Sequence, residues 1–129
     1  MLRFGYLPSD FNPMVLMLGE AEDLHALAGV LREFARAPTE TRLETLGFCA
    51  AVNDIRIALN TALPSGLHRL SGPGHVFAWN LDPAHARHCA ELIDALTQAD
   101  RPAGSEILED GEIALKVSRG EYTDDFLRP

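Results

Sequence analysis

The sequence has no long hydrophobic run and little cysteine. Its apolar stretch near the N-terminus, Met14 to Leu18, is five residues long, whereas a membrane span or a secretion signal needs a longer one. Two cysteines forty positions apart, with no signal peptide before them, favour a reducing compartment over a secreted disulfide scaffold. We therefore expect a cytoplasmic protein that has no membrane partner.

Basic residues are also scarce: 11 lysines and arginines stand against 19 aspartates and glutamates, which gives a net charge of −8. This charge argues against a nucleic-acid partner and is compatible with a basic protein partner. A chain of 129 residues is long enough to bury roughly two thirds of the surface that its unfolded form exposes. We expect a single domain spanning residues 1–129.

Hydrophobic periodicity predicts two amphipathic helices. The first covers residues 20–37, with acidic residues at its start, basic ones towards its end and Pro38 after it. The second begins at Asp82-Pro83, because the carboxylate accepts from free backbone N–H groups and proline at the first helical position loses no useful donor. It is expected to end near Asp100, ahead of Pro102. Its apolar face contains His85, Cys89, Leu92, Ile93 and Leu96.

Apolar runs bounded by turn residues predict the strands. These runs lie at residues 2–6, 14–18, 41–48, 53–59, 67–70 and 75–81. Asp110-Gly111 lies between two further apolar stretches and predicts a hairpin with a tight two-residue turn. After this turn, Ile113, Leu115 and Val117 alternate and mark the buried face of the second hairpin strand.

The predicted order of elements indicates an α+β fold: a mostly antiparallel sheet with two amphipathic helices packed on it. Both halves of the chain follow the order ββαββ, and a shift of 62 residues keeps the two helical stripes in phase. Residues 1–60 and 66–122 are therefore a possible internal repeat. The alternative is coincidence, since any two amphipathic helices can be aligned in this way.

His85, His88 and Cys89 are the candidates for a metal site, because imidazole and thiolate are ligands that zinc prefers. No CxxC or HExxH arrangement supplies further ligands, and a small buried residue is expected at Cys89 in any case. Cys49 lies in the apolar segment GFCAAV, which raises a thiol pKa and favours an inert side chain. We expect no metal, no cofactor and no catalytic activity. A small metal- or thiol-dependent enzyme stays as an alternative.

Acidic residues gather near the C-terminus. From Glu106 onward, seven acids stand against three bases, a net charge of −4 in 24 residues. Carboxylates at the rim of an interface steer a basic partner and raise its association rate, and aromatic side chains among them supply anchors. The alternative is a solvated hairpin tip followed by a frayed tail. The candidate partner-binding residues are Glu109, Asp110, Glu112, Glu121, Tyr122, Asp124, Asp125 and Phe126.

The segment from Leu115 to Tyr122, LKVSRGEY, resembles the ending VSxGEY of a group of small bacterial proteins. In that group, as in residues 77–122 here, a strand with a tryptophan and then a helix precede a hairpin. Gly104-Ser105 stands where many members have a Gly-His pair. The group is similar in kind to the single-domain proteins encoded beside bacterial toxins. The resemblance implies a non-enzymatic module that neutralises a cognate toxin by occlusion, and it implies no catalytic residues.

A second resemblance leads to a different function. The size, acidity and order of elements are similar to those of the dimeric chaperones of type III secretion effectors, although two extra strands precede the first helix and the usual last helix is absent. This resemblance implies a homodimer. We take the immunity-like binding module as the leading hypothesis, and the secretion chaperone and the small enzyme as alternatives.

Overall fold

The computed structural model describes residues 1–8 and 12–128. Within these ranges the chain has two α-helices and strands arranged in two mixed sheets, which confirms the predicted α+β class. Neither helix has the length and apolarity that crossing a bilayer requires. The elements in chain order are β1 (Leu2–Leu7), β2 (Met14–Leu18), α1 (Ala21–Arg36), β3 (Thr41–Arg42), η1 (Leu43–Thr45), β4 (Cys49–Ala51), β5 (Arg56–Asn60), β6 (Gly66–Arg69), β7 (Val76–Asn80), α2 (Pro83–Leu96), β8 (Gly104–Asp110), β9 (Ala114–Arg119) and η2 (Asp124–Leu127), where η marks a short 3₁₀ helix.

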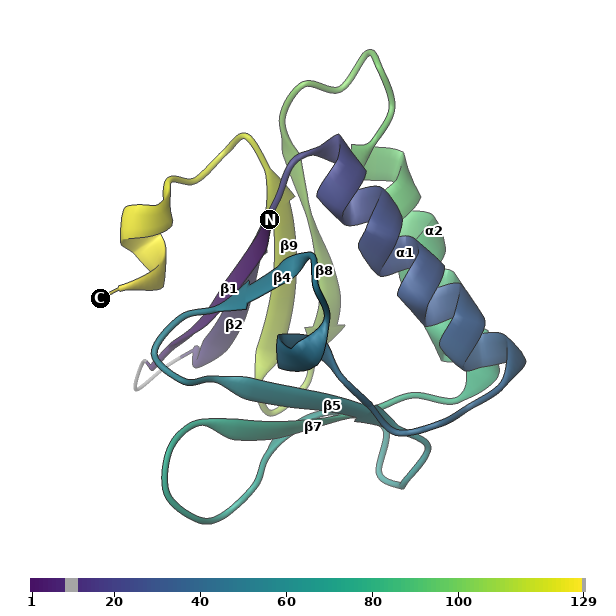
Figure 1. Cartoon of the computed structure of the whole chain (residues 1–129), viewed down its shortest axis with the longest axis vertical. Coiled ribbons are helices and arrows are strands. Elements are labelled where there is room, and N and C mark those ends of the chain that lie inside the picture. Colours follow the sequence, from purple (N-terminus) through teal and green to yellow (C-terminus); the bar gives the residue numbers. More distant parts are fainter. Residues whose placement is uncertain (9–11, 129) are drawn as a thin grey trace.

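The strands form two sheets rather than the one that was predicted. Sheet A has the order β4-β1-β2-β9-β8, and sheet B has the order β3-β5-β7-β6. The sheets meet at an angle, and α1 and α2 lie side by side across the opening between them (Figure 1). The main core contains buried residues from both sheets and both helices, so the three layers hold one another in place through shared apolar contacts.

Four of the five strands of sheet A are paired in the same pattern as the four strands of sheet B. In sheet A, β1 and β2 are antiparallel, β2 and β9 are parallel, and β9 and β8 are antiparallel. In sheet B, β6 and β7 are antiparallel, β7 and β5 are parallel, and β5 and β3 are antiparallel. In addition, β2 and β7 begin 62 residues apart, as do α1 and α2. This pattern is the one that an internal repeat would give, and the duplication itself stays a hypothesis.

The start of α2 agrees with the sequence prediction. Asp82 Oδ1 accepts a hydrogen bond from the backbone N–H of His85 at 2.7 Å, and Pro83 is the first helical residue. The helix ends at Leu96, one turn before the predicted end near Asp100. The guanidinium of Arg119 donates to the carbonyl oxygens of Leu96 at 2.9 Å and Arg101 at 3.0 Å. The bond to Leu96 satisfies an acceptor that the end of the helix leaves free, and the bond to Arg101 ties down the loop that follows.

Two of the predicted strands are shorter in the structure than in the prediction. Residues 41–48 contain only the two-residue strand β3 before the chain turns into η1, and the predicted strand at 53–59 begins later, at Arg56. Cys49 to Ala51, which was predicted to be a connection, forms β4 and pairs in parallel with β1. Apolar character alone could not separate this short strand from the connection around it.

The β8–β9 hairpin exists, but its turn and its register differ from the prediction. The last paired residues are Asp110 and Ala114, so three residues rather than two form the connection. A β-bulge between Ile107 and Glu109 also shifts the register, and Leu108 and Glu109 are both buried while Ile107 is 46% exposed. A bulge adds one residue to a strand and turns the following side chains to the other face. Ile113, Leu115 and Val117 are buried, as predicted.

Candidate functional site

Three side chains that can bind a metal ion meet where α2 packs against β8. His85 and Cys89 lie one turn apart on the same face of α2, and Glu109 comes from β8. One ligand atom from each of the three residues lies within 4.8 Å of the other two. Cys89 is fully buried, and Glu109 is 8% exposed. The β-bulge in β8 brings Glu109 to this position, because an unbroken alternation would have pointed it outward with Ile107.

Two hydrogen-bonding groups hold the Glu109 carboxylate. The indole N–H of Trp79, on β7, donates to Glu109 Oε2 at 2.8 Å, and His85 Nε2 lies 2.9 Å from the same oxygen. Trp79 is fully buried, so Glu109 gives its N–H the partner that a buried donor needs. Burial raises the pKa of Glu109 and outweighs the opposing effects of Trp79 and His85. The cluster therefore favours a bound proton or another cation beside this carboxylate.

The cysteines are placed for packing or metal ligation rather than for nucleophilic attack. Burial, and then the nearby charge of Glu109, raise the pKa of Cys89 to about 12. Burial, and then the charges of Asp23 and Glu44, raise the pKa of Cys49 to about 12 as well. A thiol with such a pKa carries almost no thiolate at neutral pH, and the thiolate is the nucleophile.

One of the three candidate metal ligands does not join the cluster. His88 is exposed on α2, on a different face from His85 and Cys89. Glu109 takes its place, although the sequence had predicted Glu109 to lie at an exposed, partner-binding edge. Its burial corrects that expectation. A sequence signal for the buried position of Glu109 lies in residues 106–110, Glu-Ile-Leu-Glu-Asp. Two apolar residues in succession there break the alternation expected of a regular strand and indicate a bulge.

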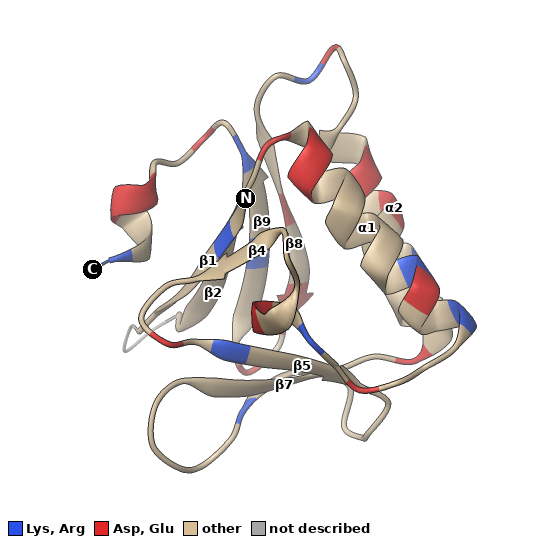
Figure 2. Cartoon of the chain, in the orientation of Figure 1, with Lys and Arg blue, Asp and Glu red and all other residues tan. Residues whose placement is uncertain are grey.

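The other candidate partner-binding residues form two groups at opposite ends of β9. Asp110 and Glu112 are exposed at the hairpin, where Glu112 Oε2 lies 3.6 Å from His68 Nδ1. Six strand residues separate them from the segment after β9, a length of roughly 20 Å. Figure 2 shows acidic residues on η2, near the hairpin and on both helices. The acidic side chains therefore do not make one continuous edge.

The C-terminal segment is folded against the outer face of sheet A and is not a frayed tail. Leu127 is 1% exposed and packs with Leu16 and Leu18 of β2. A Cβ added at Gly5 would lie 3.1 Å from the carbonyl oxygen of Leu127, so a larger residue on β1 would crowd the segment. Tyr122 packs against the same cluster, and its hydroxyl accepts from Lys116 Nζ at 2.7 Å.

Several of the predicted interface residues make contacts within the chain. The Asp124 carboxylate accepts from Arg3 Nε at 2.8 Å, and Glu121 accepts from the hydroxyl of Ser105 at 3.1 Å. Asp125 is exposed, and Phe126 is 52% exposed with its ring centroid 5.1 Å from that of Tyr122. Asp125 and Phe126 are therefore the residues of this group that are most available to a partner.

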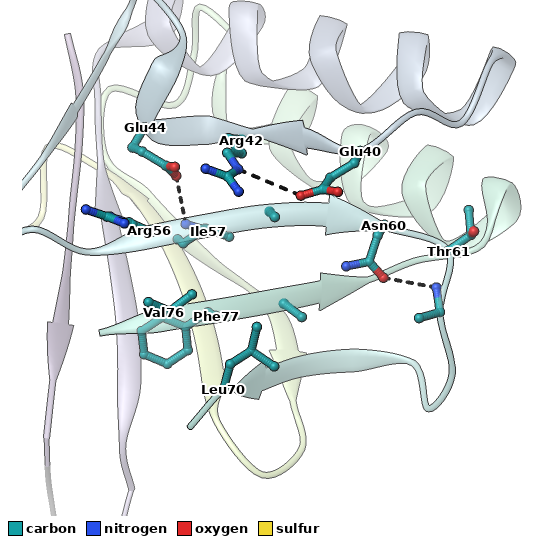
Figure 3. A pocket seen from close by; sticks show the side chains of 13 residues that line it. Glu40, Arg42, Glu44, Arg56, Ile57, Asn60, Thr61, Leu70, Val76 and Phe77 are labelled. Atoms are coloured by element: carbon teal, nitrogen blue, oxygen red, sulfur yellow. Dashed lines mark hydrogen bonds and ion pairs between the residues drawn. The ribbon is translucent and has the colours of Figure 1, made fainter. Parts of the chain in front are cut away.

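The outer face of sheet B carries a groove of about 500 Å³ (Figure 3). Its floor includes Ala58 on β5 and Ala78 on β7, which face each other in the register of the two strands. Small side chains at adjacent positions leave a hollow between longer neighbours. The groove is also lined by Glu40, Arg42, Glu44, Arg56, Ile57, Asn60, Thr61, Ala62, Leu70, Val76 and Phe77. The side chains of Ile57 and Phe77 are fully buried in the core.

Three of the four charged side chains around this groove have partners within the chain. Arg42 Nε lies 3.7 Å from Glu40 Oε1, and Glu44 Oε1 accepts from the backbone N–H of Ile57 at 2.9 Å (Figure 3). The side chain of Arg56 is exposed and forms no hydrogen bond or ion pair with the residues that the structure describes. The alternation of buried and exposed positions in β5 is visible in its residues, whereas its pairing with β7 has no local sequence signal.

No protein-family model, curated protein or solved structure compared with this chain matches it. Its function must therefore be inferred from the geometry of these sites.

Proposed function

We propose that this protein is a binding module that acts by docking a protein partner on the outer face of sheet B, without catalysing a reaction. The observation that carries this proposal is the uncovered groove over Ala58 and Ala78. The corresponding face of sheet A is covered by the chain's own C-terminal segment. A concave surface with an apolar floor and polar groups at its rim is a common form of binding site.

The chemistry of the groove favours an amphipathic segment of a protein. Val76 and Leu70 offer apolar contacts beside the alanine floor, and Leu70 is 47% exposed. Arg56, which has no partner among the described residues, can donate from its guanidinium to a carboxylate or to backbone carbonyls of the partner. An apolar anchor surrounded by polar contacts is the arrangement typical of protein interfaces.

The net charge of −8 adds an attraction for a partner that is basic overall, and it acts mainly on the rate of association. Asp125 is exposed in the C-terminal segment and is well placed for such steering. Together with the resemblance of residues 115–122, these features lead us to propose an immunity-like role: the module binds a cognate bacterial toxin and occludes its working surface.

The experiment that tests the docking face is a pair of matched substitutions. Ala58→Arg places a long charged side chain in the groove floor, whereas Gly29→Arg makes the same charge change on the exposed face of α1, where an added Cβ meets nothing within 4 Å. Affinity capture from the source cell, followed by titration with the captured protein, should show binding by the wild type and by Gly29→Arg. Binding by Ala58→Arg should be weaker by at least about tenfold, which is about 1.4 kcal/mol.

Equal binding by both variants would refute the assignment of this face. A toxin assay then tests the finer proposal, because an immunity protein must abolish the toxin's activity at a ratio near one to one. A secretion chaperone should instead be an obligate homodimer, so light scattering at micromolar concentration separates the two. A monomer would count against the chaperone.

A further inference from the structure

We propose that His85, Cys89 and Glu109 form a binding site for a single zinc ion. The ligand atoms are His85 Nε2, Cys89 Sγ and a carboxylate oxygen of Glu109, which lie within 4.8 Å of one another. This site is separate from the groove on sheet B, and the inference does not depend on the docking function.

The spacing of the three residues suits a metal centre. His85 and Cys89 lie four residues apart on α2, the separation at which two helical side chains point to one place. Zinc forms bonds of about 2.0–2.3 Å to nitrogen, oxygen and sulfur, so tetrahedral ligand atoms lie roughly 3.3–3.7 Å from one another. His85 Nε2 and Glu109 Oε2 are 2.9 Å apart. A bound ion therefore requires these two atoms to separate by less than about 1 Å.

The surroundings already orient the carboxylate. The indole N–H of Trp79 donates to Glu109 Oε2, and ligating carboxylates in metal sites are themselves hydrogen-bonded by nearby groups. The His85 side chain is 26% exposed while that of Glu109 is 9% exposed, so the imidazole side is the route by which an ion enters. A cation at this position would also compensate the charge of the buried carboxylate, which is costly to hold in the interior without a cationic partner.

The donor set selects the ion. One thiolate, one imidazole and one carboxylate make a mixed sulfur, nitrogen and oxygen set, which favours zinc over magnesium or calcium. Binding releases the thiol proton of Cys89 to solvent, because the thiolate is the ligand. The proton that His85 Nε2 and Glu109 Oε2 share across 2.9 Å must also leave these two atoms, because each binds the ion through a lone pair. Three protein ligands leave a fourth position for water, as in zinc sites that are not closed.

The test is metal binding by the untagged full chain and its variants. After dialysis against zinc and then against metal-free buffer, the wild type should retain one equivalent of zinc per chain by elemental analysis. Cobalt(II) should replace zinc and give the near-ultraviolet absorption of a cobalt–thiolate bond, with visible bands typical of tetrahedral geometry. Cys89→Ala should lose the thiolate band, and His85→Gln and Glu109→Gln should weaken zinc binding at least about tenfold.

The chain provides a matched control for two of these ligands. Cys49→Ala removes the other buried cysteine, and His88→Gln removes an exposed histidine on the same helix. Both should bind zinc as the wild type does and keep the thiolate band. His85 is part-exposed in the first turn of α2, so His85→Gln decides the question if Cys89→Ala fails to fold by circular dichroism. Failure to retain zinc, a thiolate band that survives in Cys89→Ala, or equal losses in the control variants would overturn the site.

Discussion

Replacing Glu109 with glutamine should remove a pH dependence of stability that the buried carboxyl creates. Burial raises the pKa of Glu109 despite the hydrogen bond from Trp79 and the attraction of His85. When folding raises the pKa of an acid, the folded chain keeps the proton to a higher pH than the unfolded chain does. The free energy of unfolding therefore falls as the pH rises from the unfolded pKa, about 4.3, through the folded pKa. One proton limits this slope to about 1.4 kcal/mol per pH unit.

Glutamine keeps an oxygen for the Trp79 N–H but brings no charge into the interior. We expect the variant to become progressively more stable than the metal-free wild type as the pH rises from about 4 to about 8, within that limiting slope. Trp79 is the only tryptophan and is fully buried, so its fluorescence in urea titrations follows unfolding. Cys89, with a pKa raised to about 12, does not titrate in this range.

The matched control is Asp100→Asn, which removes one exposed carboxylate from the loop before β8. Its stability relative to the wild type should change little with pH. A difference between Glu109→Gln and the wild type that stays constant from pH 4 to 8 would refute the reasoning about burial. The reasoning would also be refuted if the wild type became more stable relative to the variant as the pH rises to 8. The hydrogen bonds to the carboxylate would then outweigh its desolvation.

Other substitutions test the packing and the hydrogen bonds. Leu127→Ala should cost about 2–5 kcal/mol in urea unfolding, because it empties a buried contact on sheet A, whereas Phe126→Ala at the exposed neighbour should cost much less; similar costs would contradict the docked C-terminal segment. Neither Cys49 nor Cys89 should react with a disulfide reagent in the native protein at about pH 8, since burial raises both pKa values to about 12, and rapid native labelling would contradict this. Glu44→Ala should cost roughly 1–3 kcal/mol in urea unfolding by leaving the part-buried N–H of Ile57 without its acceptor, while Glu44→Gln, which keeps an oxygen acceptor, should cost less.

Local signals in the sequence were sufficient for much of the fold. The α+β class, the extent of α1, the capped start of α2 at Asp82-Pro83 and the buried face of β9 follow from periodicity and capping, which depend on nearby residues. The division into two sheets did not follow from them. It depends on parallel pairs such as β2 with β9 and β5 with β7, which join distant segments and have no local signature.

The candidate sites were harder to predict, for a similar reason. His85 and Cys89 could be assigned to one helix face, but their neighbour Glu109 comes from a strand whose bulge breaks the period of two. The need of Trp79 for a hydrogen-bond acceptor also became visible only when β7 and β8 were placed together. The acidic residues near the C-terminus were grouped by their order in the chain, and the length of β9 separates them in space.

The two sheets share a pairing pattern but differ in the residues at the centre of their outer faces, and this difference explains which face is covered. In sheet A the central pair of the parallel strands is Leu16 beside Lys116. Leu16 packs against Leu127, and Lys116 donates a hydrogen bond to the hydroxyl of Tyr122. In sheet B the equivalent pair is Ala58 beside Ala78. Two alanines expose little apolar area, so this face stays in water without a covering segment. The same small side chains leave the groove in which we propose that a partner binds. A larger side chain of that partner would lie over sheet B as Leu127 lies over sheet A.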